Sequence, residues 1–144
     1  MDETADLLMA AARTLRRRFG EATARWGITP SQGRALRIVL ATEEPIRLSA
    51  LAERLRIVPR SATEVVDALE GRGLVARQPD PADRRAVCVV ATDEGVRLGR
   101  LIEEARQQAA DELLRPLPEE DRATLTRILL TLLDTRTAER QDAG

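Results

Sequence analysis

Histidine, lysine and tyrosine are absent from this sequence of 144 residues, and cysteine, tryptophan and phenylalanine each occur once. A lone Cys88 and the lack of histidine exclude an internal disulfide and a zinc site with the usual ligand spacing. Without histidine or a glycine-rich phosphate loop, an enzyme would have only carboxylate, hydroxyl or guanidinium chemistry, so we expect no enzymatic activity and no cofactor. The scarcity of aromatic residues leaves aliphatic side chains to form the core, which favours packed helices over a β-sandwich.

Long apolar runs are also missing, since no segment approaches the ~20 apolar residues needed to cross a bilayer. The chain begins with acidic Asp2 and Glu3 instead of the basic start of a signal peptide. We therefore expect a cytoplasmic protein with no membrane partner. The length is that of one domain, and the formal net charge of -1 argues against indiscriminate binding to polyanions.

Every basic residue is an arginine. Arginine suits bidentate contacts to phosphates and bases, although genomic base composition would produce the same bias. The segment 54–85 contains seven arginines and five acidic residues, so its positive excess is small. The position of the arginines, more than their number, must therefore decide what this segment binds.

Apolar residues recur every three or four positions over most of the chain and predict a mainly helical protein. The expected helices cover residues 3–25, 29–42, 49–56, 59–71, 93 to the break at Pro116, and 119 onward, with Thr29, Ser49 and Thr92 as N-caps. Two β-prone runs, 74–78 and 86–91, flank a charged turn and predict a hairpin, with 46–48 as a third strand beside it. The expected fold class is mostly α with a small β-hairpin wing.

Two short helices followed by a basic hairpin are typical of a winged helix-turn-helix, in which one helix enters a DNA groove and the hairpin lies beside it. Apolar residues at 62, 65, 66 and 69 predict the buried face of the helix over 59–71. The residues that project away are the candidate DNA readers, namely Arg60, Ser61, Thr63, Glu64 and Asp67. Duplex DNA is therefore the expected partner.

The segment 48–95 resembles the MarR family of bacterial transcriptional regulators. The matching motifs are LSALAERL (48–55), PRSAT (59–63), VDALE (66–70), GLVAR (73–77) and the wing sequence Asp80-Pro81-Ala82-Asp83-Arg84-Arg85, which runs on to Thr92. The spacing of Asp83, Arg85 and Thr92 is the most specific part. In combination these motifs make a strong resemblance.

The resemblance implies a winged helix-turn-helix flanked by N- and C-terminal dimerisation helices. Residues 1–144 would form one MarR-like domain, with 29–92 as the DNA-binding part and 1–28 and 93–144 as the dimerisation part of a homodimer. These outer helices are amphipathic and suit packing across a two-fold axis, with burial within one chain as the alternative.

By motif position, Arg60, Ser61 and Thr63 would meet bases or phosphates in the major groove. Arg84 or Arg85 would enter the minor groove, and Asp83 would orient Arg85. Glu64 stands where many relatives carry a basic or larger polar residue. A glutamate there either accepts a hydrogen bond from cytosine N4 or repels phosphate.

The implied function is that of a repressor that binds a pseudo-palindromic operator with half-sites about one turn, ~10 bp, apart. A small effector, often phenolic or otherwise amphipathic, would bind between the dimerisation helices and the winged part and release the DNA. The alternative is a winged-helix protein-interaction module without sequence-specific DNA binding, because a fold does not settle a function.

Three side chains have a second interpretation. Phe19 and Trp26 are the aromatic residues available to an effector pocket, but their place on an apolar stripe favours core packing. Cys88 lies among valines of the second wing strand, so we expect a small buried hydrophobe instead of an oxidant sensor.

Overall fold

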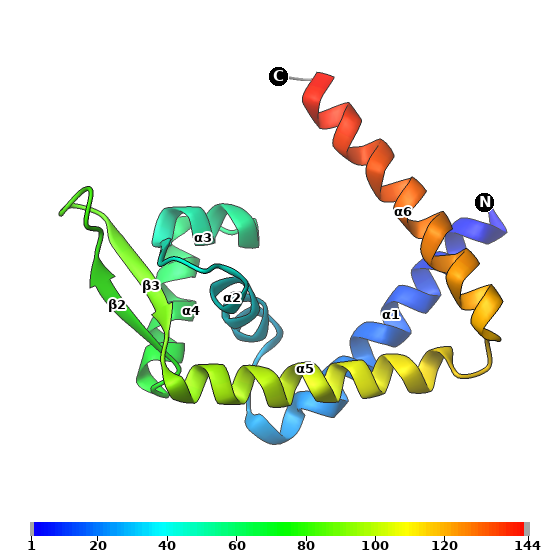
Figure 1. The fold of residues 1–144 in the computed structure, drawn as a ribbon, viewed down its shortest axis with the longest axis horizontal. Helices are drawn as coiled ribbons and strands as arrows, with labels where there is room; N and C mark the ends of the chain where they lie inside the picture. Colours follow the sequence, from blue (N-terminus) through cyan, green and yellow to red (C-terminus); the bar gives the residue numbers. More distant parts are fainter. Residues whose placement is uncertain (1, 143–144) are drawn as a thin grey trace.

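The computed structural model describes residues 2–142, with side chains described as far as residue 134. Helix α5 (Asp93–Leu114) runs along the molecule, with the winged part at one end and α6 (Glu119–Asp142) leaving from the other (Figure 1). The other elements are α1 (Glu3–Thr23), the 3-10 helix η1 (Ala24–Trp26), α2 (Pro30–Ala41), β1 (Ile46–Arg47), α3 (Leu48–Leu55), α4 (Pro59–Gly71), β2 (Val75–Pro79) and β3 (Val87–Ala91). The predicted fold class is therefore confirmed.

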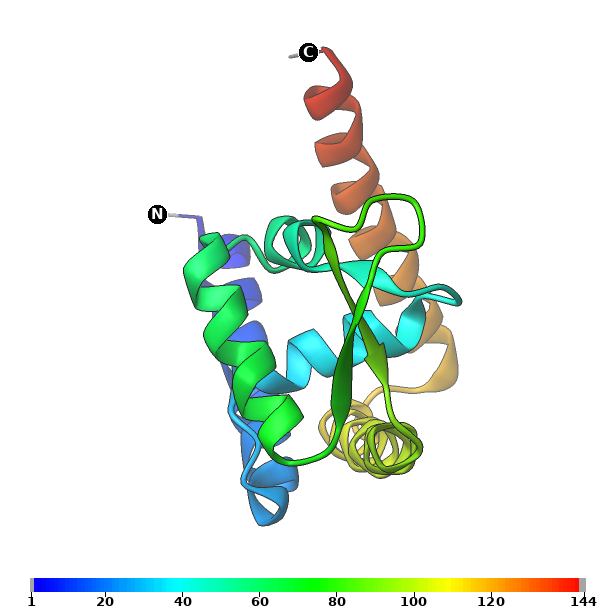
Figure 2. The ribbon, with the colours of Figure 1, turned by 90° about the vertical axis from the view of Figure 1, so that its left-hand side faces the viewer.

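The strands form one antiparallel sheet in the order β1-β3-β2. Strands β2 and β3 make the wing, with Val75 opposite Ala91, and the hairpin rises from the N-terminal end of α5 to its turn (Figure 2). Ile46 of β1 lies opposite Val89 of β3, so the predicted third strand is confirmed. This strand fixes the wing to the segment that leads into α3.

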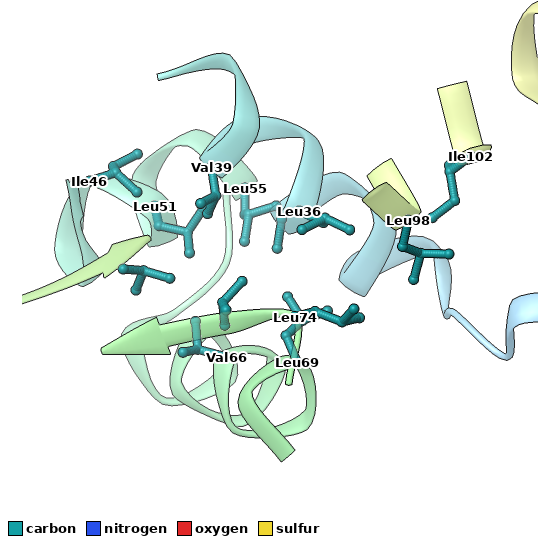
Figure 3. Packing of buried hydrophobic residues seen from close by; sticks show 13 residues of the cluster. Leu36, Val39, Ile46, Leu51, Leu55, Val66, Leu69, Leu74, Leu98 and Ile102 are labelled. Atoms are coloured by element: carbon teal, nitrogen blue, oxygen red, sulfur yellow. The ribbon is translucent and has the colours of Figure 1, made fainter. Parts of the chain in front are cut away.

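The core lies between α2, α3, α4 and the sheet and consists of aliphatic side chains (Figure 3). Its largest fully buried side chains are those of Leu36, Leu51, Val66, Leu69, Val75 and Val89. Burial of one such side chain stabilises folding by about 1.5–3 kcal/mol relative to exposure. Leu98 and Ile102 continue this cluster onto α5, so the winged part is joined to the long helix by a shared core. Trp26 packs half-buried at its edge.

Two of the predicted N-caps are confirmed. The Thr29 side chain accepts from the backbone N–H of Gln32, whose side chain accepts in return from the Thr29 N–H, a complete capping box. The Thr92 hydroxyl oxygen accepts from the backbone N–H of Gly95 at 3.0 Å and starts α5. Both caps satisfy N–H groups that lack a partner within the helix.

The prediction that Ser49 caps α3 is wrong. The helix begins at Leu48, its N-cap is Arg47, and no side chain accepts from its first N–H groups. The reason is that β1 pairs with β3 through Arg47, so the chain passes directly from strand into helix and Ser49 falls within the first turn.

The outer helices expose their apolar faces within one chain. Helix α1 packs against α5, yet none of its residues is buried, and α6 projects away from the body (Figure 1). The exposed large apolar residues of these two helices are Leu7, Leu8, Met9, Ile128, Leu130, Leu132 and Leu133. Burial within the chain therefore does not cover this apolar surface. None of the described helices is long and apolar enough to span a membrane.

Candidate nucleic-acid interface

Helix α4 divides into a buried and an outward face, as its periodicity predicts. Ala62, Val66 and Leu69 are buried. On the outward face Arg60 and Glu64 are exposed, while Ser61 and Thr63 are half-buried. The Thr63 hydroxyl donates to the Pro59 carbonyl at 3.1 Å, so its oxygen remains able to accept. Arg60 is thus the cation that α4 presents without an ion-pair partner among the described residues.

The wing turn exposes Arg84 and Arg85. No ion pair joins either guanidinium to a residue that the structure describes. Asp83 Oδ1 accepts from the backbone N–H of Arg85 at 3.0 Å, and the Asp83 carbonyl accepts from the N–H of Ala86. Asp83 therefore holds the backbone on which Arg85 is mounted and does not pair with its guanidinium.

The N-terminal end of α4 and the wing turn lie at the same end of the winged part (Figures 1 and 2). The chain reaches this arrangement because α4 leads away from this end as far as Gly71, and β2 then returns beside it toward the wing turn. Arg60 starts α4, and Arg84 and Arg85 close the hairpin turn. All three predicted arginines thus lie toward the same end of the winged part.

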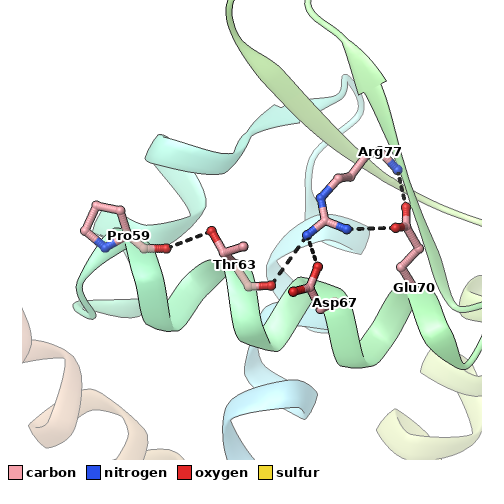
Figure 4. A network of polar contacts seen from close by, with 5 residues as sticks. All are labelled: Pro59, Thr63, Asp67, Glu70 and Arg77. Atoms are coloured by element: carbon pink, nitrogen blue, oxygen red, sulfur yellow. Dashed lines mark hydrogen bonds and ion pairs between the residues drawn. The ribbon is translucent and has the colours of Figure 1, made fainter.

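An ion-pair network that sequence reasoning missed joins α4 to the wing (Figure 4). The Arg77 guanidinium of β2 donates to Asp67 Oδ1 at 2.5 Å and to Glu70 Oε1 at 2.7 Å, and the Arg77 N–H donates to Glu70 Oε2 at 3.0 Å. Its Nη2 also approaches the Thr63 carbonyl at 3.5 Å. Burial acts to lower the pKa of Arg77, but the hydrogen bonds to Asp67 and Glu70 outweigh it and raise that pKa.

The network also binds the carboxylate of Asp67, one of the outward residues of α4 that the sequence offers as DNA readers, so this carboxylate is not free. The sequence held one signal of the network. Asp67 and Glu70 are three residues apart and so share a face of α4, and Arg77 lies in the strand that follows.

A second missed ion pair fixes the start of the wing turn. Arg47 Nε donates to Asp80 Oδ2 at 2.5 Å, and Asp80 Oδ1 accepts from the N–H of Ala82 at 2.8 Å. The Asp80 side chain is largely buried. The hydrogen bond from Ala82, followed by that from Arg47, lowers the pKa of Asp80 against the opposing effect of burial.

Arg37 of α2 and Arg106 of α5, neither of which forms an ion pair at hydrogen-bonding distance with a described residue, lie where α1, α2 and α5 come together. The Arg37 Nε is buried and makes no hydrogen bond to a described residue. The Arg106 guanidinium of α5 lies over the Phe19 ring of α1, 4.1 Å from its centroid. Burial and then the charge of Arg37 lower the pKa of Arg106, while Glu103 acts in the opposite direction. Arg37 also lines an open cavity of about 390 Å³ between α2 and α5.

The two aromatic residues and the cysteine lie as follows. Phe19 and Trp26 are half-buried, less than core packing alone predicts. Trp26 contacts the core, whereas Phe19 lies beneath Arg106. Cys88 is buried in β3, as its valine neighbours predict.

Known proteins share this sequence and this geometry. The model of the MarR family matches residues 28–87. An HTH-type transcriptional regulator of Mycobacterium leprae is 35% identical over 130 residues, which cover 88% of this chain and 87% of that protein. The HTH-type transcriptional repressor MdtR of Bacillus subtilis is 35% identical over 75 residues, 52% of this chain and 48% of MdtR.

Among solved structures, a MarR family protein from Bacillus stearothermophilus superimposes with a TM-score of 0.84 at 28% identity, covering 94% of both chains. Winged helix, wing and outer helices all fall within this match, which extends well beyond the motif segment 48–95. The chain therefore belongs to the MarR family, whose members are DNA-binding regulators of transcription and not enzymes.

Proposed function

We propose that this chain is a dimeric repressor that binds a pseudo-palindromic operator and is released by a small anionic, amphipathic effector. The observation that carries the proposal is the placement of Arg60, Arg84 and Arg85, three exposed arginines toward one end of the winged part and without ion-pair partners among the described residues. The relative MdtR is itself a transcriptional repressor. A protein with this role acts in the cytoplasm, on genomic DNA.

The apolar faces of α1 and α6 support the dimer. Monomers rarely expose a large contiguous apolar surface, because burying it stabilises the protein by roughly 25 cal/mol per Å². In the proposed assembly residues 1–28 and 93–144 form the two-fold interface, and residues 29–92 form the DNA-binding part. The two-fold axis then repeats the three arginines at a spacing that suits successive turns of one DNA face.

Readout divides between the two grooves in this proposal. Arg60 at the start of α4 reads guanine O6 and N7 in the major groove, a bidentate contact worth about 1–3 kcal/mol of discrimination. Ser61 and Thr63 bind nearby phosphates or base edges, and Glu64 accepts from cytosine N4. Arg84 or Arg85 enters a narrow minor groove, with Asp83 holding the turn that carries them.

The proposed effector site is the pair Arg37 and Arg106. The Arg106 guanidinium is desolvated and lies in the field of Arg37, whose buried Nε–H has no acceptor among the described residues; a bound carboxylate would satisfy that N–H and balance the charge. The Phe19 ring and the neighbouring cavity of about 390 Å³ offer apolar surface to the rest of such a molecule. The site joins the winged part to the dimerisation helices, so a ligand that favours another relative position shifts the population away from the DNA-binding form.

Selection of bound duplexes from a random pool at near-physiological salt tests the proposal. We expect an enriched inverted repeat with half-sites about one helical turn, ~10 bp, apart. Weak, steeply salt-dependent binding without enrichment would contradict it, since that is the behaviour of phosphate contacts alone. That result would favour a winged-helix module that binds another protein.

A further inference from the structure

Val58 is an exposed apolar side chain at the end of the winged part where Arg60 lies. In the fully described segment 29–92, the exposed large apolar residues are Val58, 64% exposed, and Val87, 39% exposed. The others lie on α1, α5 and α6 or between the last two. The apolar surface of Val58 is therefore separate from the proposed dimer interface and requires another explanation.

The backbone holds Val58 in one position. Val58 is the N-cap of α4, with φ -68 and ψ 152, and its carbonyl accepts from the N–H of Ala62 at 3.2 Å. The following Pro59 restricts its backbone to this extended region. The preceding Ile57 packs against the core, and its N–H donates to the Ala52 carbonyl at 3.1 Å. A side chain fixed in this way can read a surface with little loss of conformational entropy.

We propose that Val58 contacts the C5-methyl group of a thymine in the major groove, beside the base that Arg60 reads. This inference rests on the proposed function. Among the four bases only thymine presents an apolar group at that edge, so a valine there favours thymine over cytosine by contact with the methyl group. Val58 would thus determine specificity at one position of each half-site, without a hydrogen bond.

Val87 provides a matched control. It is also an exposed valine of the winged part, but it begins β3 directly after the wing turn, opposite Pro79. The wing is proposed to approach the minor groove, where no base presents a methyl group. Val87→Ala therefore removes similar apolar surface without removing a contact to a thymine methyl group.

The test uses the operator obtained by selection, with each thymine replaced in turn by deoxyuridine, which lacks only the methyl group. In the wild type and in Val87→Ala we expect one thymine per half-site whose replacement weakens binding about fourfold, the effect of one buried methyl-sized group. In Val58→Ala the same replacement should leave the dissociation constant unchanged. Val58→Ser, which places a favourable N-cap residue at the same site, should behave like Val58→Ala and guards against a loss caused by poorer folding.

Two results would overturn the inference. One is a wild type insensitive to every deoxyuridine replacement, and the other is the same fourfold sensitivity in the Val58 variants. Neither result would affect the proposed function, because the selected operator would already exist. The proposed function fails earlier, at the selection, if no inverted repeat is enriched.

Discussion

Replacement of Arg77 by glutamine should weaken operator binding while leaving the protein folded. Arg77 is the one described residue that bonds β2 of the wing to both Asp67 and Glu70 of α4. The two carboxylates are 62% and 43% exposed, so each pair contributes little to stability, and we expect a loss of about 1 kcal/mol in all.

The effect on DNA binding has two sources. Arg77→Gln removes the side-chain bonds that join the wing to α4, so that Arg84 and Arg85 are held less firmly relative to Arg60. It also leaves the Asp67 carboxylate without its ion-pair partner, and Glu70 with the backbone N–H of residue 77 alone, on the helix that is proposed to face DNA. Since one well-placed arginine contact is worth about 1–3 kcal/mol, we expect operator affinity to fall tenfold or more, about 1.4 kcal/mol.

Arg97→Gln is the matched control, because it removes the same charge and breaks an exposed ion pair, to Glu94, on α5. Urea unfolding followed by the fluorescence of Trp26 measures stability, and fluorescence anisotropy of a labelled operator measures affinity. Equal operator affinities for Arg77→Gln and Arg97→Gln would refute the reasoning. A loss of affinity that only follows a large loss of stability would refute it as well.

Three further outcomes follow from particular contacts. Gly95→Ala should destabilise the protein by about 1–3 kcal/mol in urea unfolding, because an added Cβ would lie 2.0 Å from the backbone carbonyl oxygen of Leu74, which cannot turn aside. At neutral pH the free energy of unfolding should be larger for the wild type than for Asp80→Asn, and this difference should shrink as pH falls below about 4. The reason is that the pKa of Asp80 is lowered in the folded protein, so the unfolded chain binds the proton first. A difference between the two proteins that does not change with pH would contradict this. An aromatic carboxylate such as benzoate should release the wild type and Arg115→Gln from operator DNA but leave Arg106→Gln bound, measured by anisotropy; equal release of all three would exclude Arg106 from the effector site.

Local signals in the sequence were sufficient for most of the fold. Helix α4 begins and ends at the predicted residues, because Pro59 suits a first helical turn and the apolar repeat ends before Gly71. The capping residues Thr29 and Thr92 act within three residues of themselves, so their hydrogen bonds were visible in the sequence. The valines on both sides of Cys88 likewise predicted its burial in β3.

The errors concern contacts between residues far apart in the chain. Ser49 is not a cap because Arg47 pairs with a strand and an aspartate more than thirty residues away. Asp67 is not a free reader because Arg77 reaches it from the wing. Helix periodicity places a side chain on a face but does not say which partner another element brings to it.

These long-range pairs explain how a chain with a net charge of -1 can present a cationic surface to DNA. Of the five acidic residues between 54 and 85, three are bound to arginines that fix the wing, namely Asp67, Glu70 and Asp80. A charge paired at hydrogen-bonding distance contributes a weak, short-ranged field at the surface, whereas an unpaired charge acts over about a Debye length, about 8 Å at physiological salt. Arg60, Arg84 and Arg85 have no such partner among the described residues, and they outnumber the two remaining acidic residues of the segment, Glu64 and Asp83. The acidic residues of the segment contribute more to holding these arginines in place than to opposing them.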